Sequence, residues 1–154
     1  MRIYQALGTI LAVGAVLVSA QPQQKPMKQF LNPIGVQRAN TWYTDVVTSR
    51  PGRVIYISGQ GGQAADGKLP ADFSSQARNT FENLKKCLAA AGASFNDVVK
   101  MNTYLTDLKN QEEFRRTRAT YLNPAAPPAS TIVIAGLGEK GHLLEVEAVA
   151  IVPD

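Results

Sequence analysis

The chain has 154 residues, of which 45% are hydrophobic and 18% are charged, and its formal net charge is +4. This length predicts a single domain, and the hydrophobic fraction excludes an intrinsically disordered protein. The single cysteine, Cys87, and the single histidine, His142, exclude a disulfide framework and a metal site rich in cysteine or histidine. The basic residues are scattered and form no stripe interleaved with aromatic residues, so we expect no nucleic-acid partner.

The first twenty residues have the pattern of a secretory signal peptide. Arg2 gives a positive start, residues 6–18 form an uncharged apolar stretch, and Val18-Ser19-Ala20 offers small residues before Gln21. The alternative is a membrane anchor, but this stretch is shorter than the ~20 residues that a spanning helix needs. We therefore expect a secreted or periplasmic protein that has no membrane partner once residues 1–20 are removed.

Residues 21–40 are predicted to form a loosely attached N-terminal arm, and residues 41–154 the folded domain. Two segments at the start of the domain, 41–47 and 53–58, are rich in β-branched and aromatic residues. The turn residues between them, Ser49-Arg50-Pro51-Gly52, predict that they pair as a hairpin. The glycines that follow are expected to make a turn with positive φ rather than a phosphate-binding loop. They are Gly59, Gly61 and Gly62.

An amphipathic helix is predicted after Asp72, which is a suitable N-cap residue. Its apolar residues recur at spacings of three and four, and Gly92 ends the helix at the C′ position. The predicted apolar face consists of Ala77, Phe81, Leu84 and Leu88. A strand over 98–105 follows.

The second helix is predicted to begin after Asn110 and to run to about Leu122. Asn110 would be its N-cap and Glu113 the capping-box partner. Two strands, over 130–134 and 143–151, complete the chain. The order β-β-α-β-α-β-β predicts an α+β fold, with a mixed sheet and two helices on one face.

The last strand alternates between two faces, and one of them carries a pair of carboxylates. Glu145 and Glu147 share their face with apolar neighbours, which is unusual for a fully solvated surface. Such half-buried carboxylates can act as a general acid or base. The alternative is a salt bridge or a hydrogen bond at a subunit interface. We expect His142, just before the strand, at the surface or the strand edge, because no catalytic or ligand motif accompanies it.

Seven short motifs occur in order, with compatible spacing, between Trp42 and Ile151. They are Ile57-Ser58-Gly59-Gln60, Asp72…Gln76…Asn83-Leu84, Ala90-Ala91-Gly92-Ala93-Ser94, Asp97-Val98-Val99-Lys100, Tyr104-Leu105-Thr106-Asp107, Pro128-Ala129-Ser130-Thr131 and Leu144-Glu145-Val146-Glu147-Ala148-Val149-Ala150. Together they resemble the RidA/YjgF family of enamine/imine deaminases. The resemblance implies a chorismate-mutase-like fold and a homotrimer that binds small molecules in pockets at its subunit interfaces.

The resemblance also implies a reaction and its residues. Glu145 would hold and activate the water that attacks a C=N bond. Neither metal nor cofactor is expected, because an imine carbon is already electrophilic and needs only a positioned water and a proton relay. The substrate-binding residues expected from matching positions are Tyr43, Ser58, Gly59, Ala129, Ser130 and Thr131.

The chain departs from the family's deaminases at Ala129. Those enzymes carry an arginine at this position, and its guanidinium binds the substrate carboxylate through paired hydrogen bonds. A hydrogen bond to a charged group is worth about 1.5–3 kcal/mol, so its loss weakens binding by about 10- to 100-fold. We therefore expect a substrate that differs from standard 2-imino acids. Arg118, near a position where many members have asparagine, either restores a positive charge to the pocket or is a solvated helix arginine, and we favour the solvated arginine.

Two functions are therefore open. One is an exported trimeric hydrolase that acts on a small imine, enamine or related electrophile through Glu145. The other is a non-catalytic trimer that binds a small molecule or another protein, which the alanine at position 129 favours. Ribonuclease activity, after which some relatives are named, is not expected, because the sequence has no histidine pair, no metal-binding carboxylate cluster and no basic stripe.

Overall fold

The computed structural model describes residues 27–37 and 41–153, which leaves the predicted signal peptide outside the described residues. The described part contains a two-stranded sheet, a four-stranded sheet, two α-helices and two short 3-10 helices. No helix in this part is both long enough and apolar enough to cross a membrane.

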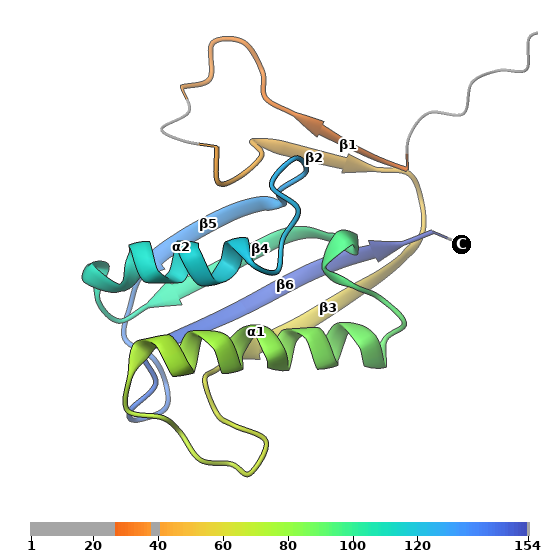
Figure 1. Ribbon diagram of the computed structural model, residues 1–154. Helices are drawn as coiled ribbons and strands as arrows, with labels where there is room; N and C mark the ends of the chain where they lie inside the picture. Colours follow the sequence, from red (N-terminus) through yellow and green to blue (C-terminus); the bar gives the residue numbers. More distant parts are fainter. Residues whose placement is uncertain (1–26, 38–40, 154) are drawn as a thin grey trace, which may run out of the picture.

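The four-stranded sheet carries both α-helices on one face (Figure 1). Its strands lie in the order β3-β6-β4-β5, with β4 and β5 parallel and the other neighbours antiparallel. Their bounds are β3 Arg53–Gln60, β4 Val98–Leu105, β5 Ala129–Ile134 and β6 Leu144–Val152; the helices are α1 Phe73–Ala90 and α2 Gln111–Ala119, and the 3-10 helices are Phe95–Asp97 and Leu108–Asn110. The predicted α+β class, with a mixed sheet and two helices on one face, is confirmed.

Helix α1 begins and ends as its sequence predicts. The Asp72 carboxylate accepts a hydrogen bond from the Ser75 backbone N–H at 2.8 Å, which satisfies one of the free donors of the first turn. Past the other end, Gly92 has a φ of 67°, in the left-handed region that glycine adopts without strain. All four residues of the predicted apolar face are buried, and they pack into the core beneath the sheet.

The side chains of strand β6 alternate between the core and the open face of the sheet. Its alternate residues Leu144, Val146, Ala148 and Ala150 are buried on the side of the helices. Because successive side chains of a strand point to opposite faces, Glu145 and Glu147 lie on the face that no helix covers. The predicted division of this strand is therefore confirmed.

The predicted hairpin between 41–47 and 53–58 is wrong. The strand in the first segment is shorter and later, β2 (Val46–Ser49), and it pairs antiparallel with β1 (Lys28–Leu31) instead. Strand β1 lies in the segment that we expected to be a loose arm. The apolar residues Phe30 and Leu31 give it β character opposite two valines of β2, while the long antiparallel partner of β3 is β6.

The predicted start of α2 is also different. Asn110 has helical backbone angles, and its side chain caps nothing. The 3-10 helix that precedes α2 is capped by Asp107, so the chain is already turning when it reaches Asn110. Glu113, the expected capping-box partner, accepts instead a hydrogen bond from Arg116 at 2.5 Å. Helix α2 then ends at Ala119, earlier than predicted.

The glycines after β3 serve a different purpose from the one predicted. Among the described residues, positive φ is confined to Gly35, Gly67, Gly92 and Gly141. A Cβ on Gly61 would overlap the ring of His142, and a Cβ on Gly62 would overlap the side chain and backbone of Gln76. These positions therefore require glycine because neighbouring elements approach the backbone closely.

Gln76, fully buried on α1, ties the loops at this end of the sheet together. Its amide nitrogen donates to the carbonyl of Pro70 at 2.7 Å and to that of Gly141 at 2.9 Å. Its amide oxygen accepts from the backbone N–H of Leu143 at 2.9 Å. The residue thus positions the backbone just before β6, two residues ahead of Glu145.

We expect Gln76→Leu to lower the free energy of unfolding by about 3 kcal/mol, because three part-buried backbone groups lose their partner at ~1 kcal/mol each and the buried glutamine can no longer bridge them. Urea denaturation measures this change. The matched control is Gln63→Leu at an exposed loop position, which we expect to stay within about 0.5 kcal/mol of the native protein. Equal stability of the two variants would contradict the role of Gln76.

Candidate functional site

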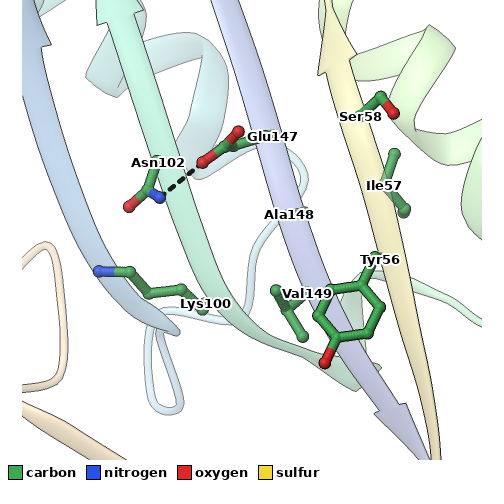
Figure 2. A pocket seen from close by; sticks show the side chains of 8 residues that line it. All are labelled: Tyr56, Ile57, Ser58, Lys100, Asn102, Glu147, Ala148 and Val149. Atoms are coloured by element: carbon green, nitrogen blue, oxygen red, sulfur yellow. Dashed lines mark hydrogen bonds between the residues drawn. The ribbon is translucent and has the colours of Figure 1, made fainter.

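The open face of the sheet holds a cavity of about 270 Å³. It lies across β3, β6 and β4, and its polar lining comes from Ser58, Lys100, Asn102 and Glu147 (Figure 2). Strand geometry explains this gathering, because Lys100 and Asn102 are two residues apart on β4 and therefore share a face. Neither residue was predicted as a site residue, although the period-two pattern of β4 places both on one face.

Glu147 is held in place by two donors from β4. The Asn102 side-chain nitrogen donates to its carboxylate at 2.7 Å, and the Tyr104 hydroxyl lies 3.3 Å from the same oxygen. The negative charge of Glu147 raises the pKa of Tyr104, so the phenol stays protonated and can donate. Glu147 is thus a structural acceptor, held by hydrogen bonds within its own chain rather than by the subunit-interface contact that we had considered.

Glu145 lies on the same face, half-buried, opposite Tyr104 in the register of β6 and β4. In the part of the chain that the structure describes, no side chain or backbone group donates a hydrogen bond to its carboxylate. The carboxylate is therefore available to accept hydrogen bonds from a water molecule or from a ligand.

A β-bulge brings the end of β3 against Glu145. Ile57 pairs with Ala148 and Gln60 with Val146, so β3 has one extra residue where it passes the acidic pair. That bulge contains Ser58 and Gly59. A Cβ on Gly59 would overlap the Glu145 carboxylate, so glycine at this position is what allows the carboxylate to lie over the backbone of β3.

A second cavity, of about 210 Å³, lies on the other side of β5, beneath α2. It is lined by Tyr43, Arg118 and Ser130, three of the predicted binding residues, and also by Trp42 and Arg115. Trp42 and Arg115 were not predicted as site residues, because only the fold brings the segment before β2 against α2.

The expectation that Arg118 is a solvated helix arginine is wrong. It is only 5% exposed, because it lies on the face of α2 that packs against the segment before β2. One terminal nitrogen, Nη1, donates to the carbonyl oxygen of Trp42 at 2.5 Å. Burial, together with the positive charge of Arg115, lowers the pKa of Arg118 to about 10. The side chain therefore remains charged at neutral pH.

The predicted site residues thus fall into two groups on opposite sides of the sheet. Glu145, Ser58, Gly59 and Thr131 border the open face, where Thr131 accepts a hydrogen bond from Lys100 at 3.1 Å. Ala129 pairs with Lys100 at the start of β5. Tyr43, Ser130 and Arg118 line the second cavity. One chain does not bring Glu145 and Arg118 into the same cavity.

His142 is not a surface residue, contrary to part of the expectation. Its side chain is 8% exposed; the ring packs over Gly61, and Nε2 lies 3.2 Å from a carboxylate oxygen of Glu139. It lies in the loop two residues before β6 begins, not on an edge strand of the sheet. Within residues 27–37 and 41–153, no three histidine, cysteine, aspartate or glutamate side chains gather closely enough to hold a metal ion.

Comparison with known proteins identifies the family. The family described as "Endoribonuclease L-PSP" matches residues 36–152. The RutC family protein YjgH of Escherichia coli is 32% identical over 105 residues, which cover 68% of this chain and 80% of that protein. TdcF of the same organism, named as a reactive intermediate deaminase, is 35% identical over 109 residues, 65% of this chain and 80% of its own.

Solved structures agree with the sequence matches. The crystal structure of YyfB, a Rid family protein of Yersinia pestis, aligns with a TM-score of 0.74 at 27% identity, and it covers 82% of this chain and all of that one. TdcF with bound serine aligns with a TM-score of 0.60 at 32% identity, over 64% of this chain and 80% of that one. The fold, the order of its motifs and these matches together establish that the chain belongs to the RidA/YjgF family.

Proposed function

We propose that the protein is a cofactor-free hydrolase of small imines or enamines, in which Glu145 positions the attacking water. The observation that carries this proposal is the difference between two neighbouring carboxylates on one face. Glu147 already accepts hydrogen bonds from β4, whereas no described residue donates to Glu145. A half-buried carboxylate that is left without a protein donor is suited to bind and deprotonate water.

Hydrolysis of an imine requires no reagent other than water. The water donates a hydrogen bond to Glu145, its oxygen attacks the imine carbon, and its proton passes to the carboxylate as the π electrons of C=N move to nitrogen. Glu145 returns the proton to that nitrogen, and the carbinolamine collapses to a carbonyl compound and ammonia. Because the imine carbon is already electrophilic, orientation of the water and proton transfer are the contributions required of the protein.

The comparisons support this reaction class. TdcF, which is named for reactive intermediate deamination, shares about a third of its aligned residues with this chain, and one of its structures contains bound serine. The alanine at position 129 supports a change of substrate, because no guanidinium stands at the start of β5 to pair with a carboxylate there.

We also propose that the working unit is a homotrimer that binds its ligand between subunits. The open face of one chain exposes apolar side chains, with Tyr56 81% exposed and Val54 and Val133 also exposed on β3 and β5. Exposed apolar patches of this kind mark contact surfaces, and the two groups of predicted site residues lie on opposite sides of one chain. In the trimer, a neighbouring subunit would cover the open face. Its second group of site residues would then complete the ligand pocket beside Glu145.

Export to the periplasm or the medium is part of the same proposal. It rests on the signal-like pattern of residues 1–20 alone. No membrane partner is proposed for the protein after cleavage.

We expect Glu145→Gln to reduce imine hydrolysis by about 100-fold or more, because a positioned general base contributes about 10²–10⁴ to the rate. An amine or amino-acid oxidase generates imines in the assay, and semicarbazide traps what is not hydrolysed. The matched control is Glu112→Gln, an exposed residue on α2, with unchanged rate. An unchanged rate in Glu145→Gln would refute its role, and absence of turnover in the native protein would favour the non-catalytic binding trimer.

Gly59→Ala tests whether the position of the Glu145 carboxylate matters. The new methyl group occupies the space of the carboxylate and displaces it, and a displacement of about 1 Å can lower a rate by about 100-fold. The control is Gly136→Ala, where an added Cβ meets nothing within 4 Å. If both variants hydrolyse imines at the native rate, the close approach of Gly59 to Glu145 has no catalytic significance.

Ala129→Arg tests the substrate class. The new guanidinium can pair with a substrate carboxylate, so we expect hydrolysis of 2-imino acids to rise by about 10- to 100-fold, with little change for imines that lack a carboxylate. Ala125→Arg, at an exposed position of the preceding turn, is the matched control and should change neither rate. If the native protein and Ala129→Arg hydrolyse 2-imino acids at the same rate, the proposed change of substrate is wrong.

A further inference from the structure

A groove of about 340 Å³ lies at the end of helix α1, on the side of the molecule that carries the helices. We call it the α1 groove. Its walls are the exposed α1 residues Lys85 and Ala89, the segment from Ala93 to Asn96 that leads into β4, and Tyr121, which follows α2. Because the helices cover the face of the sheet opposite to the open face (Figure 1), the α1 groove stays accessible in the proposed trimer.

The floor of the α1 groove is apolar, and its rings are held in place. The ring centroids of Phe95 and Tyr121 lie 5.5 Å apart, and Tyr121 stacks at 4.9 Å on the fully buried ring of Phe81. The Tyr121 hydroxyl donates to the Glu82 carboxylate at 2.9 Å. Leu88, also buried, completes the floor. These side chains present an apolar surface on which another bulky apolar side chain can pack.

One wall of the groove is fixed by hydrogen bonds of its own. The Asp97 carboxylate accepts from the backbone N–H of Ser94 at 2.8 Å and from its hydroxyl at 3.0 Å, as part of a capping box. Lys28 of β1 donates to the carbonyl of Asn96 from the other side. The groove is therefore already formed in the single chain, which lowers the entropic cost of binding a partner.

Two lysines give the surface around the groove its charge. Lys85 lines the groove and Lys86 follows it, both exposed on α1, and in the described part of the chain neither pairs with a carboxylate. The carboxylates closest to the lining, those of Glu82 and Asp97, already accept hydrogen bonds within the chain. An acidic partner would thus meet unpaired positive charges next to an apolar floor.

We propose that the α1 groove binds an acidic peptide segment of another protein. One bulky apolar side chain of that segment packs on the rings of Phe95 and Tyr121 as an anchor. The acidic residues beside the anchor interact with Lys85, while Lys86 adds to the positive potential. The groove and Glu145 lie on opposite faces of the sheet, so this binding is separate from the proposed hydrolysis and can be measured without turnover.

The probe is a fluorescein-labelled peptide with one phenylalanine between two pairs of glutamates. Its fluorescence anisotropy should rise saturably with added protein, and salt should weaken the binding because exposed charges are screened. A peptide with alanine in place of phenylalanine, and another with lysines in place of the glutamates, should each bind at least about 10-fold more weakly. Binding of either control as tight as that of the acidic peptide, or no saturable binding up to about 1 mM, would overturn the proposal.

Ala89→Glu tests the location. The longer, negatively charged side chain occupies the groove and repels the peptide, so we expect binding to weaken by at least about 10-fold. Ala90→Glu is the matched control, because it adds the same charge at the next exposed position of α1, outside the lining, and should bind nearly as the native protein does. Native affinity in Ala89→Glu would overturn the proposal.

Sedimentation velocity of the same proteins tests the other possible occupant, a second copy of the chain. We expect the native protein, Ala89→Glu and Ala90→Glu to form assemblies of the same size. An assembly that becomes smaller in Ala89→Glu alone would show that a second copy fills the groove, and the proposal of an acidic segment would then be wrong.

Discussion

The position of β6 between β3 and β4 fixes which residues face the core and which face the open side of the sheet. The strand is antiparallel to both neighbours, and its buried residues alternate with the two glutamates. A shift of one residue would bring Glu145 and Glu147 under the helices and expose the apolar set. Two unpaired carboxylates would then be buried, at a cost larger than most single contacts can offset. The hydrophobic core thus determines which face of the sheet carries the acidic pair.

The geometry around Glu145 depends on close packing at one end of the sheet. Gln76 reaches from α1 to the backbone that enters β6, and Gly61 and Gly62 let the loop after β3 lie against His142 and against α1. Gly59 does the same for Glu145 itself. None of these glycines needs an unusual φ. The site therefore requires glycine at these positions because neighbouring groups lie close to the backbone. A methyl group added at Gly59 would displace the Glu145 carboxylate.

Charge is distributed unevenly across the two sides of the sheet. The open face carries carboxylates, one already bound by Asn102 and Tyr104 and one available. The side beneath α2 carries Arg118 and Arg115 with buried nitrogens that no described residue satisfies. Groups of this kind reduce the stability of the folded chain, and they are typical of places where a ligand or a neighbouring subunit supplies the missing partner.

Local patterns in the sequence determined helix α1, with its Asp72 cap and Gly92 end, and the alternation of β6, because both follow from neighbours within a few residues. The fold class and the identity of Glu145 as the residue of interest followed from the same patterns and from the order of the motifs. Tertiary structure alone decided that β2 pairs with β1, that Asp107 replaces Asn110 as the cap, and that Arg118 is buried. These outcomes depend on which distant segment packs against each residue, and the residue's own neighbours in sequence carry no record of that contact.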